Sequence, residues 1–481
     1  MAYTAFITRI KNLRQHPNAD RLQMGECFGN TVIVSMDYTD NQIGIYFPSD
    51  GQVSVAFAEA NNLLRKKDEN GNNIGGYMDE SKRNVTAIKR RGEKSDGLFL
   101  SLKSLETFGD ISTLKEGDRI DTFNGHEICC KYVPRRNHRS GGTSHGNKTR
   151  KKKVDVAPLF TEHADTEQLA YNLGAFKPGD EIEIPLKMHG TSQRTAHLPV
   201  FKGYKRTLWD KIRRKEGTPV YDWGYVSGTR RTVLENYDGG YYGSNEFREQ
   251  HSKFFEGKLW KGEEVYYEVV GFTHTGTPIM ASCDNKKLND KEFVKQYGKE
   301  TVFSYGCEPN PVVHEGYNDS TYGYQNEHIK YKLPQSDIYV YRMTMTNEDG
   351  DVIEYTPDFM RYRCEQMGVK TVPVMWKGVI PHHLSKKIDV DSDNDGNLDW
   401  TVETFSNAGE WIKSIAEQYY DGPDPIGKTH VREGVVVRIL NRPKFAAYKH
   451  KNWSFKALEG IVKVEADAPD MEEAQDESIE S

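Results

Sequence analysis

Cysteine and long apolar runs are scarce in this sequence. Its six cysteines include no Cys-x-x-Cys pair, which argues against a zinc ribbon and against a disulfide framework. No apolar run reaches the roughly 18 residues that a membrane-spanning helix needs. The segment MAYTAFITRIKNLRQ lacks the long apolar core of a secretion signal. We therefore expect an intracellular, cytoplasmic protein, or one in the host cytoplasm if the chain is viral.

The chain also lacks an overall positive charge. Its 481 residues carry a formal net charge of −6, which excludes a basic coat protein for nucleic acid, so any nucleic-acid surface must be local. Residues 131–153 are basic and almost free of apolar side chains. They predict a flexible linker over 129–156, which is either simply solvated or also touches phosphates. The acidic residues 464–481 predict a disordered tail.

The linker separates two regions that differ in the length of their apolar runs. Residues 1–128 contain short β-rich runs separated by turn residues, namely AFITRI, TVIVSM, IGIYFP, NVTAIKRR and DGLFLSL. This spacing predicts a small barrel or sandwich. Residues 157–463 contain longer apolar runs, namely EIEIPLKM, WGYVSGT, EVYYEVVGF, DIYVYRMTM and EGVVVRIL, and a helical pattern, EWIKSIAEQYYD. Runs of this kind are typical of strands buried on both faces, so we predict an α+β domain here.

The segment Lys187-Met188-His189-Gly190-Thr191-Ser192 follows the apolar run EIEIPL directly. A lysine at the end of a buried strand, before a glycine turn, is well placed as a nucleophile. A free lysine has a pKa of about 10.4, and desolvation or nearby positive charge lowers the pKa of such an amine. Taken alone, the Lys-x-His-Gly pattern is more typical of a surface lysine at a turn.

Further polar groups follow in order along the apolar runs. Glu268 lies within the run YYEVVG, and Tyr341 shares one face of the strand DIYVYR with Tyr339. Glu433 precedes the buried run GVVVRIL. Lys449 and Lys451 then lie two residues apart, which places them on one face of a strand.

This ordered set resembles the nucleotidyltransferase motifs of covalent ATP-dependent polynucleotide ligases, and Lys-x-His-Gly in place of Lys-x-Asp-Gly is similar to the RNA ligase 2-like branch. The N-terminal segments RQHPNADRL, GQVS and IKRRGEKSDGL resemble the OB-like module that precedes the catalytic domain in Deinococcus-type RNA ligases. HPNADRL also occurs in tRNA-binding OB modules of synthetases. The resemblance covers roughly residues 5–458. It implies an N-terminal OB-like β-barrel over 1–128 and an α+β nucleotidyltransferase domain over 157–463.

The resemblance implies roles for single residues. Lys187 would attack the α-phosphorus of ATP and hold AMP, Glu268 would bind the ribose hydroxyls, and Tyr341 would stack on adenine, although Tyr341 as an ordinary core residue is the alternative. Glu433 would hold a catalytic metal ion, Mg²⁺ or Mn²⁺. Lys449 and Lys451 would contact the α-phosphate and stabilise charge in the transition state.

Two positions depart from the family pattern, and a third leaves a choice open. Arg230 and Arg231 are adjacent in SGTRRT, and one of them would grip a phosphate; we favour Arg231, because the family arginine is usually followed by Asn or Thr. Ser192 replaces a frequent Asn and has a shorter reach. His189 replaces the aspartate of other ligases, and we expect it to be structural.

The expected activity is the joining of RNA 3′-hydroxyl and 5′-phosphate ends, acting on nicked duplex or paired ends, in RNA repair. The alternatives are a capping-type guanylyltransferase and a non-catalytic RNA-binding protein with a ligase-like fold. Residues 391–399 resemble the start of a calcium-binding loop, but Val402 occupies the position of the bidentate acid, so we predict a polar surface loop. The insertion 276–324 carries no motif that we can interpret.

Overall fold

The computed structural model describes most of residues 3–132, 154–275, 335–390 and 399–456, with short gaps inside these ranges, and the short strands at 313–315 and 330–332. The central part of the predicted linker, nearly all of the 276–324 insertion, most of the acidic loop and the acidic tail lie outside the described residues. The chain divides into two compact units. The first comprises Met1–Arg136 with Trp453–Asp470, and the second comprises Asn137–Asn452 with Met471–Ser481.

The first unit consists mainly of short strands, as its turn-rich sequence predicts. Its strands are β1 (Ala5–Arg9), β2 (Lys11–Gln15), β3 (Leu22–Cys27), β4 (Asn30–Ser35), β5 (Ile43–Phe47), β6 (Gly51–Val53), β7 (Arg65–Lys67), β8 (Asn73–Gly75), β9 (Asn84–Val85), β10 (Ala87–Arg90), β11 (Glu93–Asp96), β12 (Leu98–Ser101), β13 (Arg119–Ile120), β14 (Thr122–Phe123), β15 (His126–Glu127) and β16 (Cys129–Lys131). The larger sheets have the orders β12-β5-β1-β13, β16-β6-β9 and β2-β3-β4. The described strands form these separate sheets and not a closed barrel, because many of them are too short to extend a ladder from one sheet to the next. The OB-like module therefore stays a prediction.

The core of the first unit is formed by apolar side chains from these sheets and from helix α1 (Val55–Ala60). Ser54 caps α1 by accepting a hydrogen bond from the Phe57 amide at 3.1 Å. The ring of Phe57 packs between Phe47 and Phe108, with centroids 5.3 and 5.9 Å away. A 3₁₀ helix, η1 (Leu102–Phe108), supplies Phe108.

The chain returns to the first unit after β30 (Ala446–Lys451). Phe455 is fully buried, and the Lys456 ammonium lies 2.7 Å from the Asp96 carboxylate. Lys94 lies over the Trp453 ring at 4.4 Å. The sequence predicts a second domain that extends to residue 463, whereas Trp453–Asp470 group with the first unit in the structure.

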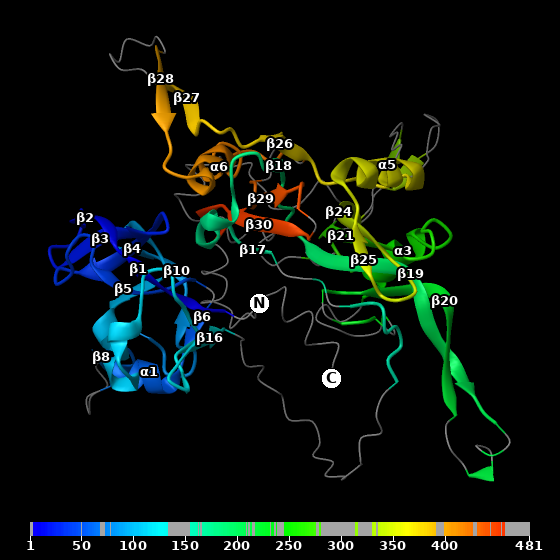
Figure 1. Ribbon diagram of the computed structural model, residues 1–481, viewed down its shortest axis with the longest axis horizontal. Coiled ribbons are helices and arrows are strands. Elements are labelled where there is room, and N and C mark those ends of the chain that lie inside the picture. Colours follow the sequence, from blue (N-terminus) through cyan, green and yellow to red (C-terminus); the bar gives the residue numbers. More distant parts are fainter. Residues whose placement is uncertain are drawn as a thin grey trace. The chain divides into compact units, whose positions relative to one another are not determined.

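Two five-stranded sheets form the framework of the second unit (Figure 1). The first has the order β17-β30-β29-β18-β26 and the second the order β20-β19-β21-β24-β25. The strands not yet given are β17 (Glu167–Gln168), β18 (Glu181–Pro185), β19 (Thr191–Lys205), β20 (Thr218–Gly228), β21 (Glu263–Gly271), β24 (Ser336–Thr346), β25 (Val352–Glu354), β26 (Val374–Val379) and β29 (Gly434–Ile439). The strands predicted from the apolar runs of this half are all present. Two further pairs are β22 (Val313–Glu315) with β23 (Lys330–Lys332), and β27 (Ser385–Val390) with β28 (Asp399–Thr404).

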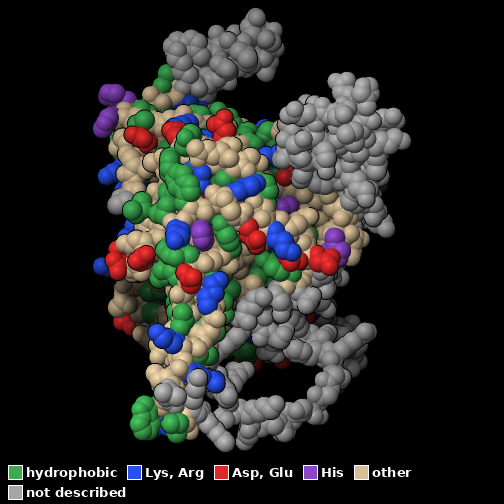
Figure 2. Space-filling view, turned by 90° about the vertical axis from the view of Figure 1, so that its right-hand side faces the viewer, with side chains coloured by type: hydrophobic (Ala, Val, Ile, Leu, Met, Phe, Trp, Pro, Cys, Tyr) green, Lys and Arg blue, Asp and Glu red, His purple; other side chains and the backbone are tan. Residues whose placement is uncertain are grey.

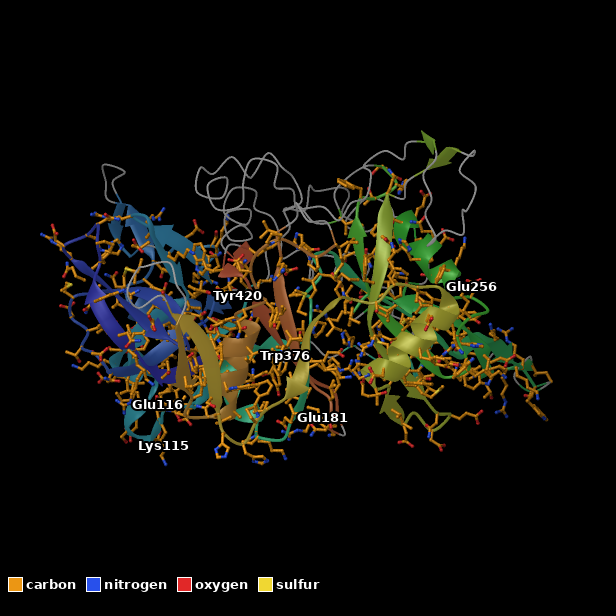
Figure 3. The ribbon with its side chains drawn as sticks, turned by 90° about the horizontal axis from the view of Figure 1, so that it is seen from above. Lys115, Glu116, Glu181, Glu256, Trp376 and Tyr420 are labelled. Atoms are coloured by element: carbon orange, nitrogen blue, oxygen red, sulfur yellow. The ribbon has the colours of Figure 1, made fainter. Side chains whose placement is uncertain are left out.

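Helices accompany both sheets. Helix α6 (Ala408–Ala416) overlaps the predicted helical pattern, which runs from Glu410 to Asp421. It follows the cap Asn407, which accepts a hydrogen bond from the Glu410 amide. Its Trp411 meets Trp376 of β26 edge to face, with centroids 6.1 Å apart; Figure 3 labels Trp376, and Glu181 at the start of the neighbouring strand β18. On the other sheet lie α3 (Glu246–Phe254) and α5 (Pro357–Met367), and α5 ends at Gly368 in the left-handed conformation. Two 3₁₀ helices, η3 (Leu169–Tyr171) and η4 (Leu173–Ala175), precede β18.

Candidate active site

Lys187 lies in the short segment that leaves one sheet and enters the other. Strand β18 ends at Pro185 in the first sheet, and β19 begins at Thr191 in the second. The Lys187 amide donates to the Gly434 carbonyl at 2.9 Å. A Cβ atom at Gly190 would lie 2.3 Å from the Val269 carbonyl oxygen of β21, so only glycine permits this close crossing. The local sequence therefore fixes the lysine where the two sheets meet.

Helix α3 holds the start of β19 in place. The Arg248 guanidinium is almost completely buried. It donates to the Thr191 hydroxyl at 2.7 Å and to the Ser192 carbonyl at 3.0 Å. These hydrogen bonds anchor the backbone just after the Lys-x-His-Gly turn, so the turn cannot shift along the sheet without breaking buried charged contacts.

A buried carboxylate gathers three cationic or polar groups around Lys187. Glu433 Oε1 lies 2.8 Å from Lys187 Nζ and 3.0 Å from Lys451 Nζ, while Oε2 lies 3.2 Å from His189 Nδ1. Burial raises the pKa of Glu433, but the two lysines and His189 outweigh burial and hold that pKa well below its usual range. The carboxylate is therefore ionised at neutral pH, and His189 has a contact that orients it.

Strand pairing explains why Glu433 and Lys451 meet. Gly434 pairs with Lys451 and Val436 with Lys449 in the antiparallel register of β29 and β30. Gly434 has a φ of 151°, and a Cβ there would lie 2.2 Å from the His450 carbonyl oxygen. Glycine thus lets the strands approach where Glu433 turns toward the lysines.

A cavity opens beside Lys187 in the second unit. Six of the predicted site residues line it, namely Lys187, Ser192, Arg230, Glu268, Tyr341 and Lys449. Glu268 pairs with Ser192 across β19 and β21, and the Ser192 hydroxyl hydrogen-bonds the Tyr341 hydroxyl at 2.9 Å. Burial raises the pKa of Tyr341 above its usual range, and the nearby Glu268 adds to the rise. Tyr341 is therefore a neutral phenol that can both donate and accept.

The cavity-lining residues that were not among the sequence predictions include His163, Arg438 and Phe445. The His163 amide donates to the Arg230 carbonyl at 3.0 Å, and its ring lies 6.0 Å from the Tyr341 ring. His163 Nδ1 lies 2.9 Å from Arg342 Nη1. No motif precedes His163, so nothing in the sequence pointed to it. Arg438, by contrast, interrupts the apolar run GVVVRIL, and a charged residue in a buried strand could have served as a signal.

Arg342 and Arg438 bring positive charge close to one end of the cavity. Arg342 forms an ion pair with Glu354, and its guanidinium lies 4.4 Å from the Phe445 ring. Arg438 lies 3.6 Å from the same Glu354 carboxylate. Burial lowers the pKa of Arg438, although arginine remains charged at any physiological pH. With Lys187, Arg230 and Lys449 in the lining, the cavity wall is suited to an anion.

The two remaining predicted residues have different outcomes. Lys451 is not among the residues that line the cavity and instead contacts Glu433. Arg231, the arginine that we favoured for phosphate, lies outside the described residues, whereas Arg230 lines the cavity.

Within the described part of the chain, no group of three His, Cys, Asp or Glu side chains is arranged to hold a metal ion. No helix in that part is long and apolar enough to cross a bilayer.

The fold of this chain is similar to that of several solved structures. Three structures of an RNA ligase from Naegleria gruberi match 94% of this chain: a lysine mutant with AMP and manganese, another with ATP and manganese, and a ligand-free mutant. Their TM-scores are 0.50, 0.51 and 0.50, and the match covers 97%, 98% and 97% of those chains. The fold resembles that of an RNA ligase.

Sequence identity to these three structures is 15%, 14% and 16%, so the likeness is one of fold. No family model matches the chain, and no curated protein does so either. The nucleotidyltransferase-like arrangement predicted from the motif order is thus supported. The Deinococcus-type branch stays a prediction, because the matched structures come from another RNA ligase.

Proposed function

We propose that this protein is an ATP-dependent RNA ligase that works through a covalent adenylate on Lys187. One observation carries the proposal: Lys187 and Lys451 share a single carboxylate oxygen of Glu433, at the edge of a cavity lined by Glu268, Tyr341 and Lys449. A surface lysine at a turn would not have a buried carboxylate partner, a second ammonium group and a cavity beside it.

The cavity suits a purine nucleotide. Glu268 would accept hydrogen bonds from the ribose hydroxyls, and the aromatic rings of Tyr341, His163 and Phe445 supply faces on which adenine can stack. Arg230 and Lys449 would bind the phosphates. Under this assignment, the hydrogen bond from Ser192 holds the Tyr341 ring in a fixed orientation.

The first step joins Lys187 to AMP. The neutral Nζ atom attacks the α-phosphorus of ATP, the bond to the β-phosphate oxygen breaks, and pyrophosphate leaves. Lys187 must lose a proton for this. Because Lys451 contacts the same oxygen of Glu433, the carboxylate keeps a cationic partner when Lys187 becomes neutral. Lys449 and Lys451 then stabilise the negative charge on the phosphate in the transition state.

The second and third steps use the same site. A 5′-phosphate oxygen of RNA attacks the phosphorus of the lysyl adenylate, which breaks the N–P bond and returns the amine of Lys187. A 3′-hydroxyl of RNA then attacks the 5′-phosphorus, a phosphodiester forms, and AMP leaves. Each step is an in-line displacement, so most of the catalysis is positioning and electrostatic stabilisation.

A divalent cation, Mg²⁺ or Mn²⁺, fits this site when the nucleotide supplies most of its ligands. The Glu433 carboxylate lies 2.8 Å from Lys187 Nζ, and Mg²⁺ is commonly bound by one or two carboxylates together with substrate phosphates and water. The cation would neutralise phosphate charge. We assign Glu433 as its protein ligand.

The remaining assignments complete the proposal. We infer that residues 1–128 act as an OB-like module that binds nucleic acid, that 129–156 is a basic linker, that the adenylyltransferase domain spans 157–463, and that 464–481 is an acidic tail. The substrate would be nicked duplex or paired RNA ends in RNA repair, in the cytoplasm. A protein truncated to begin near Val154 tests the division of labour. It should still form the adenylate and lose most nick sealing.

The deciding experiment incubates the purified protein with a divalent cation and either α-labelled ATP or α-labelled GTP. We expect label on the protein from ATP, and sealing of a 5′-phosphorylated RNA nick. Labelling from GTP alone would favour the capping-type guanylyltransferase. No label from either nucleotide, with RNA binding intact, would favour the non-catalytic protein and contradict the proposal.

A further inference from the structure

Strands β19 and β20 continue past the sheet as a two-stranded arm (Figure 1). Strand β19 pairs with β21 from Thr191 to Ala196, whereas its pairing with β20 continues to Lys205. The arm is therefore an extension of the strand that begins beside Lys187. Strand β19 has 15 residues, which gives a length on the order of 45 Å at ~3.3 Å per residue.

One face of the arm carries a row of partly exposed aromatic side chains. The His197 ring stacks on Tyr225 at 4.5 Å and meets the edge of Trp223 at 5.8 Å. Farther out, Phe201 lies 6.0 Å from Tyr221 and 5.1 Å from Tyr204.

The opposite face is covered. Leu198, Val200 and Val226 pack there against Ala157 and Phe160. Tyr225 also packs against the core of this sheet, whereas Phe201, Tyr204 and Tyr221 lie farther out, beyond the pairing of β19 with β21.

The tip of the arm is both aromatic and basic. Trp209 and Ile212 are 68% and 71% exposed, and the Arg213 guanidinium lies 5.7 Å from the Trp209 ring. Lys202 and Lys205 are exposed as well. Residues 202–216 contain seven lysines and arginines and two acidic residues, in a chain whose net charge is −6. Figure 2 shows hydrophobic side chains gathered at the lower end of this face of the molecule, with Lys and Arg side chains above them.

We propose that this β19–β20 arm binds the RNA substrate at a distance from the reacting ends. The inference rests on the proposed function. Stacking of unpaired bases on aromatic faces and contact of phosphates with Lys and Arg are two ways in which proteins hold RNA strands. The arm supplies both along one face, and Lys261 adds a charge 5.3 Å from the Trp223 ring. Binding of an apolar protein partner would not require the excess of positive charge in residues 202–216.

The length of the arm also determines how far an RNA must extend from the nick to contact it. Strand β19 begins at the cavity, which Ser192 lines, and the far end of the strand, in the arm, lies on the order of 45 Å from there. An RNA that reaches only a few nucleotides from the nick stays near the cavity. An RNA that extends by tens of ångströms meets the aromatic row and the tip.

The test uses the full chain with a Trp209→Ala variant and a second variant, Lys205→Glu with Arg213→Glu. The control is Tyr362→Ala, which removes an aromatic side chain of α5 that is 53% exposed. Binding is measured by fluorescence anisotropy with a short nicked RNA duplex and with a long one whose far end is single-stranded, so that unpaired bases can reach the arm, at several salt concentrations. Formation of the lysyl adenylate is measured in parallel and should be unchanged in all variants.

We expect Trp209→Ala to weaken binding of the long RNA about tenfold, the effect of losing one stacked base, and to leave the short RNA unaffected. The charge-reversal variant should lower the salt dependence of long-RNA binding, by about one unit of slope for each lost phosphate contact. Equal affinity and slope for wild type, both variants and the control would overturn the proposal. So would loss of binding to anionic lipid vesicles in the variants while RNA binding stays intact.

Failure of the ligase proposal gives a different result. If the wild-type protein forms no lysyl adenylate and yet its affinity for long RNA depends on Trp209, the chemistry assigned to Lys187 is wrong and the arm is supported. If the adenylate forms and long-RNA affinity is independent of Trp209, the arm proposal alone is wrong.

Discussion

The two ends of strand β19 differ in almost every physical respect. At its start, Ser192 lies beside Lys187 in a cavity where charges are buried and paired, and the backbone is held by Arg248. At its far end, Lys205 and the tip that follows are exposed, with Trp209 open to solvent. A single strand thus connects a preorganised reaction site to a surface suited to a large, variable ligand. Chemistry needs fixed geometry, whereas binding of a long polymer tolerates side chains that adapt.

The largest effect is expected from removing the reactive lysine next to the start of β19. Lys187→Ala should abolish the adenylate, because it removes the amine that attacks the α-phosphorus. The measurement is intact mass after incubation with ATP and Mg²⁺, where wild type should gain one AMP. The control is Lys253→Ala on the surface of α3, whose side chain is 63% exposed. A full-yield adduct in the Lys187→Ala protein would contradict the assignment.

Lys451→Ala should slow adenylate formation by about 100-fold or more, the usual effect of losing one charged group that stabilises a transition state. Folding should survive, since Lys187 and His189 still contact Glu433. Single-turnover rates with ATP give the comparison. Lys456→Ala is a matched control, because Lys456 is also a partly buried lysine paired with a carboxylate, that of Asp96. Equal rates for Lys451→Ala and wild type would remove Lys451 from the mechanism.

Glu433→Gln should lower the free energy of unfolding by about 3 kcal/mol, since it leaves two buried ammonium groups without a counter-charge. The pKa of Glu433 is depressed in the folded state, so its contribution to stability is present above the usual pKa of a glutamate and is lost as pH falls through the depressed value. Urea unfolding at neutral pH and under acid conditions checks this. The gap between wild type and variant should narrow at low pH, and a constant gap would show that the carboxylate is not ionised.

The smallest expected effects are on stability, for one side chain at the start of β19 and one at the tip of the arm. Ser192→Ala should cost about 1 kcal/mol of stability, because it leaves the buried Tyr341 hydroxyl without this hydrogen bond. Trp209→Ala should change stability by less than about 0.5 kcal/mol, as is usual for exposed positions. Thermal unfolding of both proteins provides the comparison. A larger loss for Trp209→Ala would mean that this ring packs against the protein and is not free for RNA.

Local sequence determined the strands and the order of the site residues. Apolar runs such as EVYYEVVGF and EGVVVRIL became β21 and β29, because a strand buried on both faces needs apolar residues throughout. The glycines of Lys-x-His-Gly and of Glu433-Gly434 sit where a Cβ atom would collide with a neighbouring strand. These features depend on a few adjacent residues, and they could therefore be predicted.

Tertiary structure alone decided which distant groups meet. Nothing in the sequence around His163 predicts that it lines the cavity with Tyr341, or that Glu433 contacts two lysines and His189. The return of Phe455 to the first unit also went unforeseen. No local motif singles out the basic and aromatic residues of the arm, and it is the register of β19 and β20 that places their rings in one row. Contacts of this kind depend on strand order and register across hundreds of residues, and local patterns of charge and hydrophobicity do not encode them.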